Sequence, residues 1–348
     1  MPLQPTHTFN LGHGPNRYTR AGRRFLFAAA SADGALSLFG ETGVRPIPHS
    51  LQGIRAISLN ESGELLAVSH DAGLAIMRLD GSIVFSADPP KPTSTPKTSS
   101  ARPFEVKFGS ILFDTMDGSL WCAAATSPQQ IEIQRRGSTD WSVVESITIE
   151  DPLYESGYFL QATPRSGPAL WLGGGQDGLE TCWIVRGESL TATLDPLLQD
   201  LGPPVFSPSG FDFLAGAHDL RSIRRFKFPE VEEIGACETS EVDLEKLEWD
   251  DDYDLQFDPC LVYLDERHAL IEVVDGRPFL FDVENMCLLR EVLIEDHLPA
   301  PVSAYYPQLT AEQLCTDLIS FDECGDLVMF IFRQDPGQVL LFSKTSFL

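Results

Sequence analysis

The residues with the most distinctive chemistry in this chain are carboxylates that gather in one segment, residues 230–258. This segment holds 13 acidic residues and a single basic residue, Lys246, so its net charge is −12 within a chain of net charge −26. Such a field repels phosphates, and it therefore argues against nucleic acid and against an anionic membrane surface as partners. It attracts basic protein surfaces and speeds their association at low salt.

The predicted partner-binding residues are eight carboxylates and two aromatic side chains of this segment. They are Glu241, Asp243, Glu245, Glu248, Trp249, Asp250, Asp251, Asp252, Tyr253 and Asp254. Leu244, Leu247 and Phe257 could add apolar anchors, and Ser240 could cap a short helix. The alternative, a solvated acidic insertion that only keeps the protein soluble, stays open. Residues 250–254 lack the alternating ligands and central Gly of a calcium loop.

Other candidate sites are isolated. A His-Asp pair occurs twice, as His70-Asp71 and His218-Asp219. The simplest interpretation is that both His are turn residues beside a structural Asp. The glycines at 173–175 are not followed by Lys-Ser or Lys-Thr, so they favour a crowded strand over a phosphate cradle. The seven Cys and seven His show no metal-ligand spacing, and Cys within strands suits a core. We therefore predict no catalytic residue, no cofactor and no metal.

A scaffold of short strands must position the acidic segment. An apolar stretch, an Asp usually followed closely by Gly, and a second apolar stretch return seven times, which is typical of hairpins. The landmark residues, predicted to be structural turns, are Asp33, Asp71, Asp117, Asp177, Asp219, Asp275 and Asp335. Successive landmarks lie 38 to 60 residues apart, which brackets the ~40 to 50 residues of a four-stranded blade.

Residues 54–85 show one complete unit. Four strands are expected at 54–59, 65–69, 74–79 and 82–85, with Gly in each intervening turn. This stretch resembles a WD40 repeat, and the architectural resemblance covers nearly the whole chain. The Trp-Asp dipeptide of WD40 repeats is degraded in this chain, since only Phe281-Asp282 keeps an aromatic residue followed by Asp at the corresponding position. The pattern predicts an all-β fold, a seven-bladed β-propeller of four-stranded antiparallel blades, with residues 1–348 forming a single domain.

The two ends of the chain are expected to share one blade. After Asp335 there is room for little more than one strand, at 338–342, so residues 6–11 should supply the outermost strand of that blade. An open ring would leave two unpaired sheet edges, which are prone to aggregation. We therefore predict a ring closed by N- and C-terminal strands in one blade.

Three segments break the rhythm of the blades. Residues 87–103 form a Pro/Ser/Thr-rich loop, either a flexible connection between blades or a docking peptide. Within residues 193–204, Asp195-Pro196 is typical of the start of one helical turn. The third segment is the acidic insertion at 230–258.

The opening residues show no basic stretch followed by an apolar run, and no stretch of 18 apolar residues occurs, so we expect a cytoplasmic protein. The function expected is a noncatalytic protein-binding propeller. Its concrete form is an inhibitor or immunity-type protein that blocks a basic protein partner through the acidic surface. Two alternatives stay open, a scaffold subunit of a multiprotein assembly and a propeller hydrolase or lyase with a central-channel site.

Overall fold

The computed structural model describes residues 3–21, 24–92, 105–150, 157–164, 167–173, 178–186, 188–244, 247, 255–273, 277–294, 318–332 and 337–348. For residues 15–16, 258–260, 318–324 and 332 it describes the backbone alone. Contacts divide the chain into two compact units, residues 14–199 (unit I) and residues 1–13 with 200–348 (unit II). That residues 1–348 form one domain stays a prediction.

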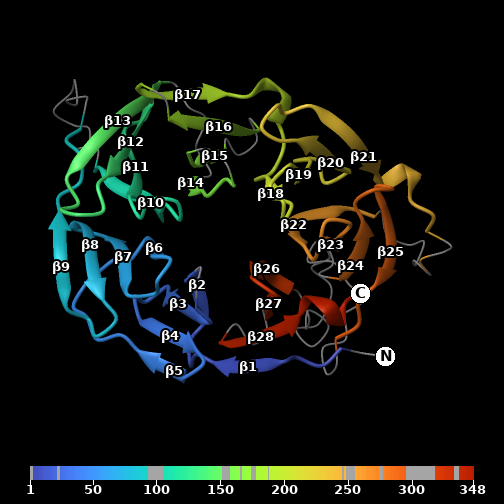
Figure 1. The fold of residues 1–348 in the computed structure, drawn as a ribbon, viewed down its shortest axis with the longest axis horizontal. Coiled ribbons are helices and arrows are strands. Elements are labelled where there is room, and N and C mark those ends of the chain that lie inside the picture. Colours follow the sequence, from blue (N-terminus) through green and yellow to red (C-terminus); the bar gives the residue numbers. More distant parts are fainter. Residues whose placement is uncertain are drawn as a thin grey trace, which may run out of the picture. The chain divides into compact units, whose positions relative to one another are not determined.

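Unit I holds four sheets of four antiparallel strands each. In each sheet the first strand lies on the inner side of the unit and the fourth on its outer side (Figure 1). The first sheet contains β2 (Pro15–Arg20), β3 (Leu26–Ser31), β4 (Leu36–Gly40) and β5 (Gly43–Pro46), and the second β6 (Ala56–Leu59), β7 (Leu65–His70), β8 (Gly73–Arg78) and β9 (Ile83–Ala87). The third contains β10 (Lys107–Phe113), β11 (Leu120–Ser127), β12 (Gln130–Arg136) and β13 (Val143–Glu150), and the fourth β14 (Gly157–Gln161), β15 (Ala169–Gly173), β16 (Leu179–Arg186) and β17 (Leu190–Leu194).

Unit II holds the remaining three sheets, so the chain forms the seven four-stranded blades that the repeat predicts. Blade 5 contains β18 (Val205–Phe206), β19 (Asp212–Gly216), β20 (Ser222–Lys227) and β21 (Glu233–Glu238), and blade 6 contains β22 (Phe257–Tyr263), β23 (His268–Val273), β24 (Pro278–Asp282) and β25 (Cys287–Glu291). Blade 7 contains β26 (Leu318–Cys324), β27 (Leu327–Phe332), β28 (Gln338–Ser343) and β1 (His7–Asn10).

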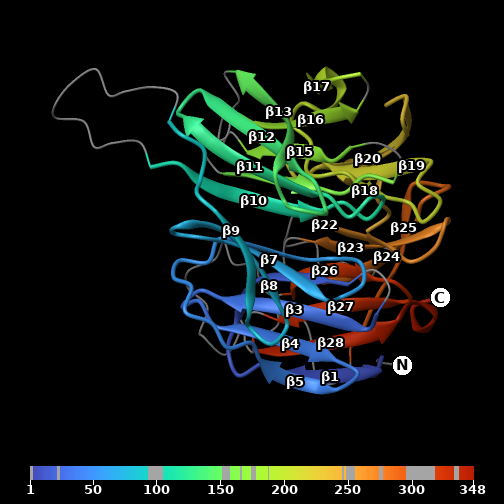
Figure 2. The same ribbon diagram turned by 60° about the vertical axis from the view of Figure 1, so that its left-hand side comes forward.

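Blade 7 is completed by the N-terminal strand. Strand β1 pairs antiparallel with β28, with His7 opposite Leu341 and Asn10 opposite Gln338, and the two strands lie side by side in both views (Figures 1 and 2). The pairing continues past the strand, since the backbone N–H of Leu11 donates to the Gly337 carbonyl at 2.8 Å. The prediction that residues 6–11 supply the outermost strand of a blade shared by both chain ends is therefore confirmed.

The described landmark aspartates do not all occupy the same turn. Asp33, Asp71 and Asp219 lie between the second and third strands of their sheets, whereas Asp117 lies between the first and second strands, β10 and β11. Asp117 therefore does not mark the equivalent turn of its blade. Asp177, Asp275 and Asp335 lie outside the described residues.

Hydroxyl groups on the inner strands join neighbouring blades of unit I. At each of three junctions a Ser or Thr hydroxyl of one inner strand accepts a hydrogen bond from a backbone N–H of the next. The pairs are Thr19 with Leu59 (3.1 Å), Ser58 with Phe113 (3.0 Å) and Ser110 with Leu160 (2.8 Å). A buried N–H without an acceptor is costly, so this recurrent bond fixes each blade against the next.

Two predicted local structures have different outcomes. Residues 196–198 form the 3₁₀ helix η2 (Pro196–Leu198), and the Asp195 side chain accepts the Leu197 N–H at 3.0 Å, as the sequence predicts. In η3 (Thr239–Glu241), Ser240 lies inside the turn and the cap position belongs to Glu238, which makes no side-chain cap bond. The prediction that Ser240 caps a helix is wrong.

Of the predicted Pro/Ser/Thr-rich loop at 87–103, Ala87 belongs to strand β9 and residues 88–92 have no regular structure. Residues 93–103 lie outside the described part of the chain. Over the described ranges, no helix has the length and apolar character needed to span a membrane.

Candidate functional site

The acidic segment is an insertion over only part of its length. Its residues 233–238 form β21, the fourth strand of blade 5, and Phe257 already belongs to β22. The predicted insertion at 230–258 is thus corrected to the connection between β21 and β22. Along β21 Glu233 is exposed and Cys237 is buried, and the register with β20 shifts between Glu233 and Gly235. The exposed end of the strand can therefore carry acidic residues.

Part of the negative charge is balanced locally. Arg224 Nη1 lies 3.5 Å from Glu233 Oε2, and Lys227 Nζ lies 2.8 Å from Glu232 Oε2. Arg224 and Lys227 thus pair with acidic residues of the segment, whereas Arg225 pairs with Asp212 of β19. Such exposed pairs stabilise a protein by only about 0 to 1 kcal/mol, so their main effect is to reduce the local field.

A groove of about 330 Å³ opens beside the segment, between the end of β21 and the turn that joins β24 to β25. Two of the predicted partner-binding residues, Glu241 and Asp243, line it and are exposed. Its other polar and apolar lining residues are Cys237, Val242, Leu247, Asn285, Met286, Cys287 and Leu288, with Ala236. The groove therefore combines carboxylates with apolar surface.

The β24–β25 turn is held by one carboxylate. Asp282 Oδ1 accepts the backbone N–H groups of Glu284 and Asn285 at 3.0 Å each, and its Oδ2 accepts from Asn285 Nδ2 at 2.9 Å. Burial acts to raise the pKa of Asp282, but the hydrogen bonds from Asn285 and the nearby Arg267 guanidinium lower it overall. The carboxylate thus stays ionised and fixes the turn that presents Met286.

Met286 packs against the outer strand of blade 5. It adopts a φ of 50°, and its Cγ would lie 2.8 Å from a Cβ atom added at Gly235. A side chain at 235 would force Met286 to shift. Met286 of the β24–β25 turn and Ala236 of β21 both line the groove, so both elements contribute to its wall.

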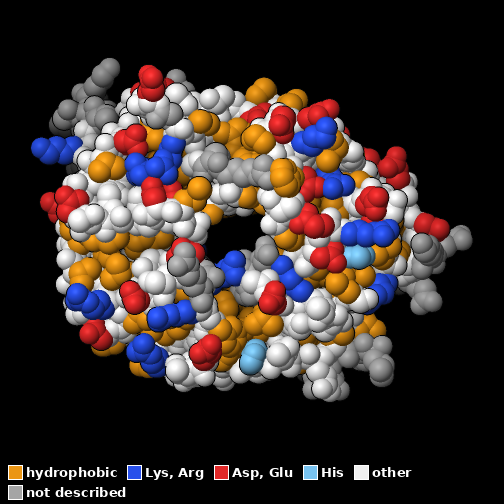
Figure 3. Space-filling model, in the orientation of Figure 1, with side chains coloured by type: hydrophobic (Ala, Val, Ile, Leu, Met, Phe, Trp, Pro, Cys, Tyr) orange, Lys and Arg blue, Asp and Glu red, His pale blue; other side chains and the backbone are white. Residues whose placement is uncertain are grey.

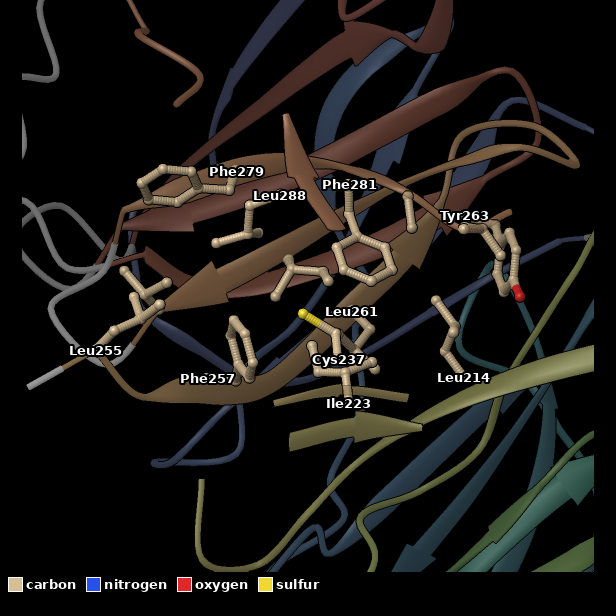
Figure 4. Close-up of a cluster of buried hydrophobic side chains, with 14 residues drawn as sticks. Leu214, Ile223, Cys237, Leu255, Phe257, Leu261, Tyr263, Phe279, Phe281 and Leu288 are labelled. Carbon is tan, nitrogen blue, oxygen red and sulfur yellow. The ribbon is translucent and has the colours of Figure 1, made fainter. Parts of the chain in front are cut away.

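The groove rests on the core between blades 5 and 6 (Figure 4). Phe257 is only 1% exposed within this core, and Leu244 and Leu247 are half-buried against it. The prediction that Phe257 anchors a partner is therefore wrong, because its ring holds the segment onto the blades. Leu247 contacts the core with part of its side chain and also lines the groove.

The buried thiol of the groove, Cys237, is a poor nucleophile. Cys237 and Cys287 are both free, and the Cys237 sulfur points into the core in Figure 4. Burial raises the pKa of Cys237 to about 12, with further contributions from Cys287 and the carboxylate of Glu241. A thiol with this pKa stays protonated at neutral pH, which suits a core residue.

The structure brings two of the ten predicted partner-binding residues, Glu241 and Asp243, to the groove. The other eight, Glu245, Glu248, Trp249, Asp250, Asp251, Asp252, Tyr253 and Asp254, lie outside the described residues. The described part of the chain contains no group of three His, Cys, Asp or Glu side chains arranged to hold a metal ion.

Comparisons with known proteins address the fold. No protein-family model and no curated protein matches this chain. Among solved structures, the β-propeller domain of Cps50 (Swd1) from Myceliophteria thermophila is similar, with a TM-score of 0.57 and 12% sequence identity over 98% of this chain and 99% of that one. The chain has the fold of a seven-bladed β-propeller. At this identity the likeness is one of fold.

Proposed function

We propose that this propeller is a noncatalytic binding module that engages a basic protein through the groove between β21 and the β24–β25 turn. One observation carries the proposal: the exposed carboxylates of Glu241 and Asp243 share a single groove with half-buried apolar side chains. A Lys or Arg side chain has matching chemistry, because its aliphatic stem packs on apolar surface while its charged head pairs with carboxylates.

The remaining carboxylates of the segment act at longer range. A dense negative field raises the association rate of a positively charged partner, and this effect weakens with salt. In its most specific form the proposal is an inhibitor or immunity-type protein that covers the cationic surface of its partner. The charge of the segment is the one feature that supports an inhibitor or immunity-type protein. We also propose that the protein resides in the cytoplasm, which the sequence alone supports.

A scaffold subunit of a larger assembly is the second candidate, because WD40-like propellers generally serve as protein-binding scaffolds. A hydrolase or lyase has less support. The cavity among the inner strands of unit I has no Asp, Glu, His or Cys among its described lining residues, so it offers no general base of these types.

Site-specific photo-crosslinking tests the proposal. A benzoylphenylalanine placed at Asn285, which is exposed and lines the groove, is irradiated in native lysate, with the same group at exposed Ile83 on β9 as the matched control. We expect a basic protein to crosslink at 285 and not at 83. The double variant Glu241→Gln/Asp243→Asn should reduce that crosslink several-fold.

Crosslinks of the same protein at both positions would contradict the proposal, as would a partner of acidic or neutral charge at 285. A partner retained at full yield by the double variant would favour the scaffold function over charge-directed binding.

A further inference from the structure

The four described methionines lie in three different environments. Met77 and Met329 are fully buried, whereas Met116 is 70% exposed in the turn between β10 and β11. Met286 is half-buried, packs against the core between blades 5 and 6, and lines the groove between β21 and the β24–β25 turn, the acidic groove. Hydrophobic side chains lie among charged ones on the face drawn in Figure 3, so partial exposure alone marks no site. Met286 is set apart by what it covers.

The thioether of Met286 covers part of β21. Its Cγ lies 2.8 Å and its Sδ 3.5 Å from the position of a Cβ atom added at Gly235. Residues i and i+2 of a strand share one face of the sheet, so Cys237 lies next to this contact on the same face. Cys237 lines the groove and is only 4% exposed. The Met286 side chain therefore helps to close the groove beside the Cys237 thiol.

An oxygen atom on the Met286 sulfur does not suit these surroundings. Hydrogen peroxide transfers one oxygen to a methionine sulfur: the O–O bond breaks, an S–O bond forms and water leaves. The resulting sulfoxide is polar, whereas Leu247 and Leu288 in the same lining are apolar. Glu241 and Asp243, as carboxylates, accept hydrogen bonds and donate none. Because a buried polar atom without a partner is costly, the sulfoxide favours a position turned toward solvent.

We propose that Met286 is an oxidation-sensitive gate of the acidic groove: the thioether closes the groove against β21, and the sulfoxide leaves Gly235 and exposes Cys237. The turn itself keeps its conformation, because Asp282 accepts the backbone N–H groups of Glu284 and Asn285. The change is reversible, since methionine sulfoxide reductases remove the oxygen as water while two thiols form a disulfide. Loss of this apolar wall also weakens the binding of a basic partner, a consequence that rests on the proposed function.

Thiol labelling of Cys237 tests the gate without any partner. The full chain carrying Cys287→Ser, which removes the more exposed thiol of the groove, is treated with hydrogen peroxide, and peptide mass spectrometry follows the methionines. We expect Met116 to oxidise first and Met286 next, while the two fully buried methionines stay reduced. Iodoacetamide at pH 8 should then label Cys237 several-fold faster than before oxidation, and a methionine sulfoxide reductase should restore the slow rate.

Three variants separate the gate from general damage. Met286→Leu keeps the apolar bulk but has no sulfur, so peroxide should no longer change the labelling of Cys237, whereas the matched control Met116→Leu should keep the response. Met286→Gln, with a polar side chain of similar length, should speed the labelling of Cys237 without peroxide. Cys122 and Cys182, which are buried in unit I, should stay unlabelled throughout, because the chain remains folded.

An unchanged rate at Cys237 would overturn the proposal, whether Met286 is oxidised or resists peroxide. So would a response that persists in Met286→Leu, or one accompanied by labelling of Cys122 and Cys182. The crosslink at residue 285 separates this gate from the proposed function, and it should be weaker in Met286→Gln than in Met286→Leu. Equal crosslinks would contradict the effect on the partner. A Cys237 response with no crosslinked partner would support the gate and contradict the proposed function alone.

Discussion

The two units of this propeller are built from the same kind of blade and differ in charge. Unit I has 15 basic and 20 acidic residues, a net charge of −5, whereas unit II has 10 basic and 31 acidic residues, a net charge of −21. Among the described residues, both units fill their cores with the same aliphatic and aromatic residues, so the difference in charge does not come from the apolar core. Net charge can therefore change without changing the blade.

The junctions between blades also differ. In unit I hydroxyls of the inner strands join successive blades in addition to the apolar clusters between them. Blades 5 and 6 of unit II meet through a core that includes Phe257, Phe279 and Phe281. Arg225 crosses this junction and donates to the Val283 carbonyl at 3.2 Å. The acidic groove is thus supported by apolar packing, and neutralising its carboxylates should leave its shape intact.

The largest effect is expected at that aromatic junction. Phe281 is fully buried, so Phe281→Ala should lower the free energy of unfolding by about 3 to 5 kcal/mol, measured by urea denaturation. Phe281→Leu, which keeps much of the volume, is the control and should cost clearly less. Equal losses in the two variants would mean that packing at this position does not hold blades 5 and 6 together.

The hydroxyl junctions of unit I should give a smaller effect. Ser110→Ala leaves the Leu160 N–H without its acceptor and should cost about 1 to 3 kcal/mol. The control Ser86→Ala removes an exposed hydroxyl from β9 and should change stability by less than about 0.5 kcal/mol. If the two variants are equally stable, the recurrent interblade bond is not a stabilising feature.

The third prediction concerns pH. Burial acts to raise the pKa of Asp117, but hydrogen bonds from Ser119 and Arg135 outweigh it and hold this pKa far below its ordinary value of 3.8. A lowered pKa stabilises the folded state above pH 3.8, and this contribution is lost as the pH falls below that value. Asp117→Asn should therefore be less stable than the wild type at pH 7 and closer to it at pH 2.5, in urea denaturation at both values. A constant difference would show that the charge of Asp117 is not responsible.

The smallest expected effect is a difference in reactivity among the cysteine thiols. Burial raises the pKa of Cys122, Cys182 and Cys237 to about 12 each, whereas Cys287 is partly exposed. Iodoacetamide at pH 8 should therefore modify Cys287 before these three, as peptide mass spectrometry of the folded chain would show, and urea should remove the order. Early modification of Cys237 would mean that the floor of the groove opens readily.

The periodic pattern predicts the fold well and the groove only in part. Gly in the turns and alternating apolar residues locate the four strands of residues 54–85 to within two residues of β6, β7, β8 and β9. The shared blade follows from chain length, because one strand after Asp335 needs a partner from the other end. The strands and the shared blade follow from local residue types and from the number of residues available, and both can be read from the sequence.

The groove depends on contacts between distant residues. Met286 lies 51 residues after Gly235, and no local pattern indicates that one packs on the other. Asp282 followed by Asn285 is a local turn signal that could have located the β24–β25 turn. The acidic neighbours of Phe257 in the sequence favour a position on the partner surface, whereas its place in strand β22 turns its side chain into the core.

The central claim is that the carboxylates of the groove attract and hold a basic protein. The most direct test measures the association rate of the crosslinked partner with the wild type, with Glu241→Gln/Asp243→Asn, and with Glu41→Gln/Glu64→Gln, which removes two exposed carboxylates from unit I. We expect the rate to fall steeply between about 0.05 and 0.5 M salt, and to fall at low salt only in the groove variant. A rate that is independent of salt, or equal in the two variants, would contradict the account.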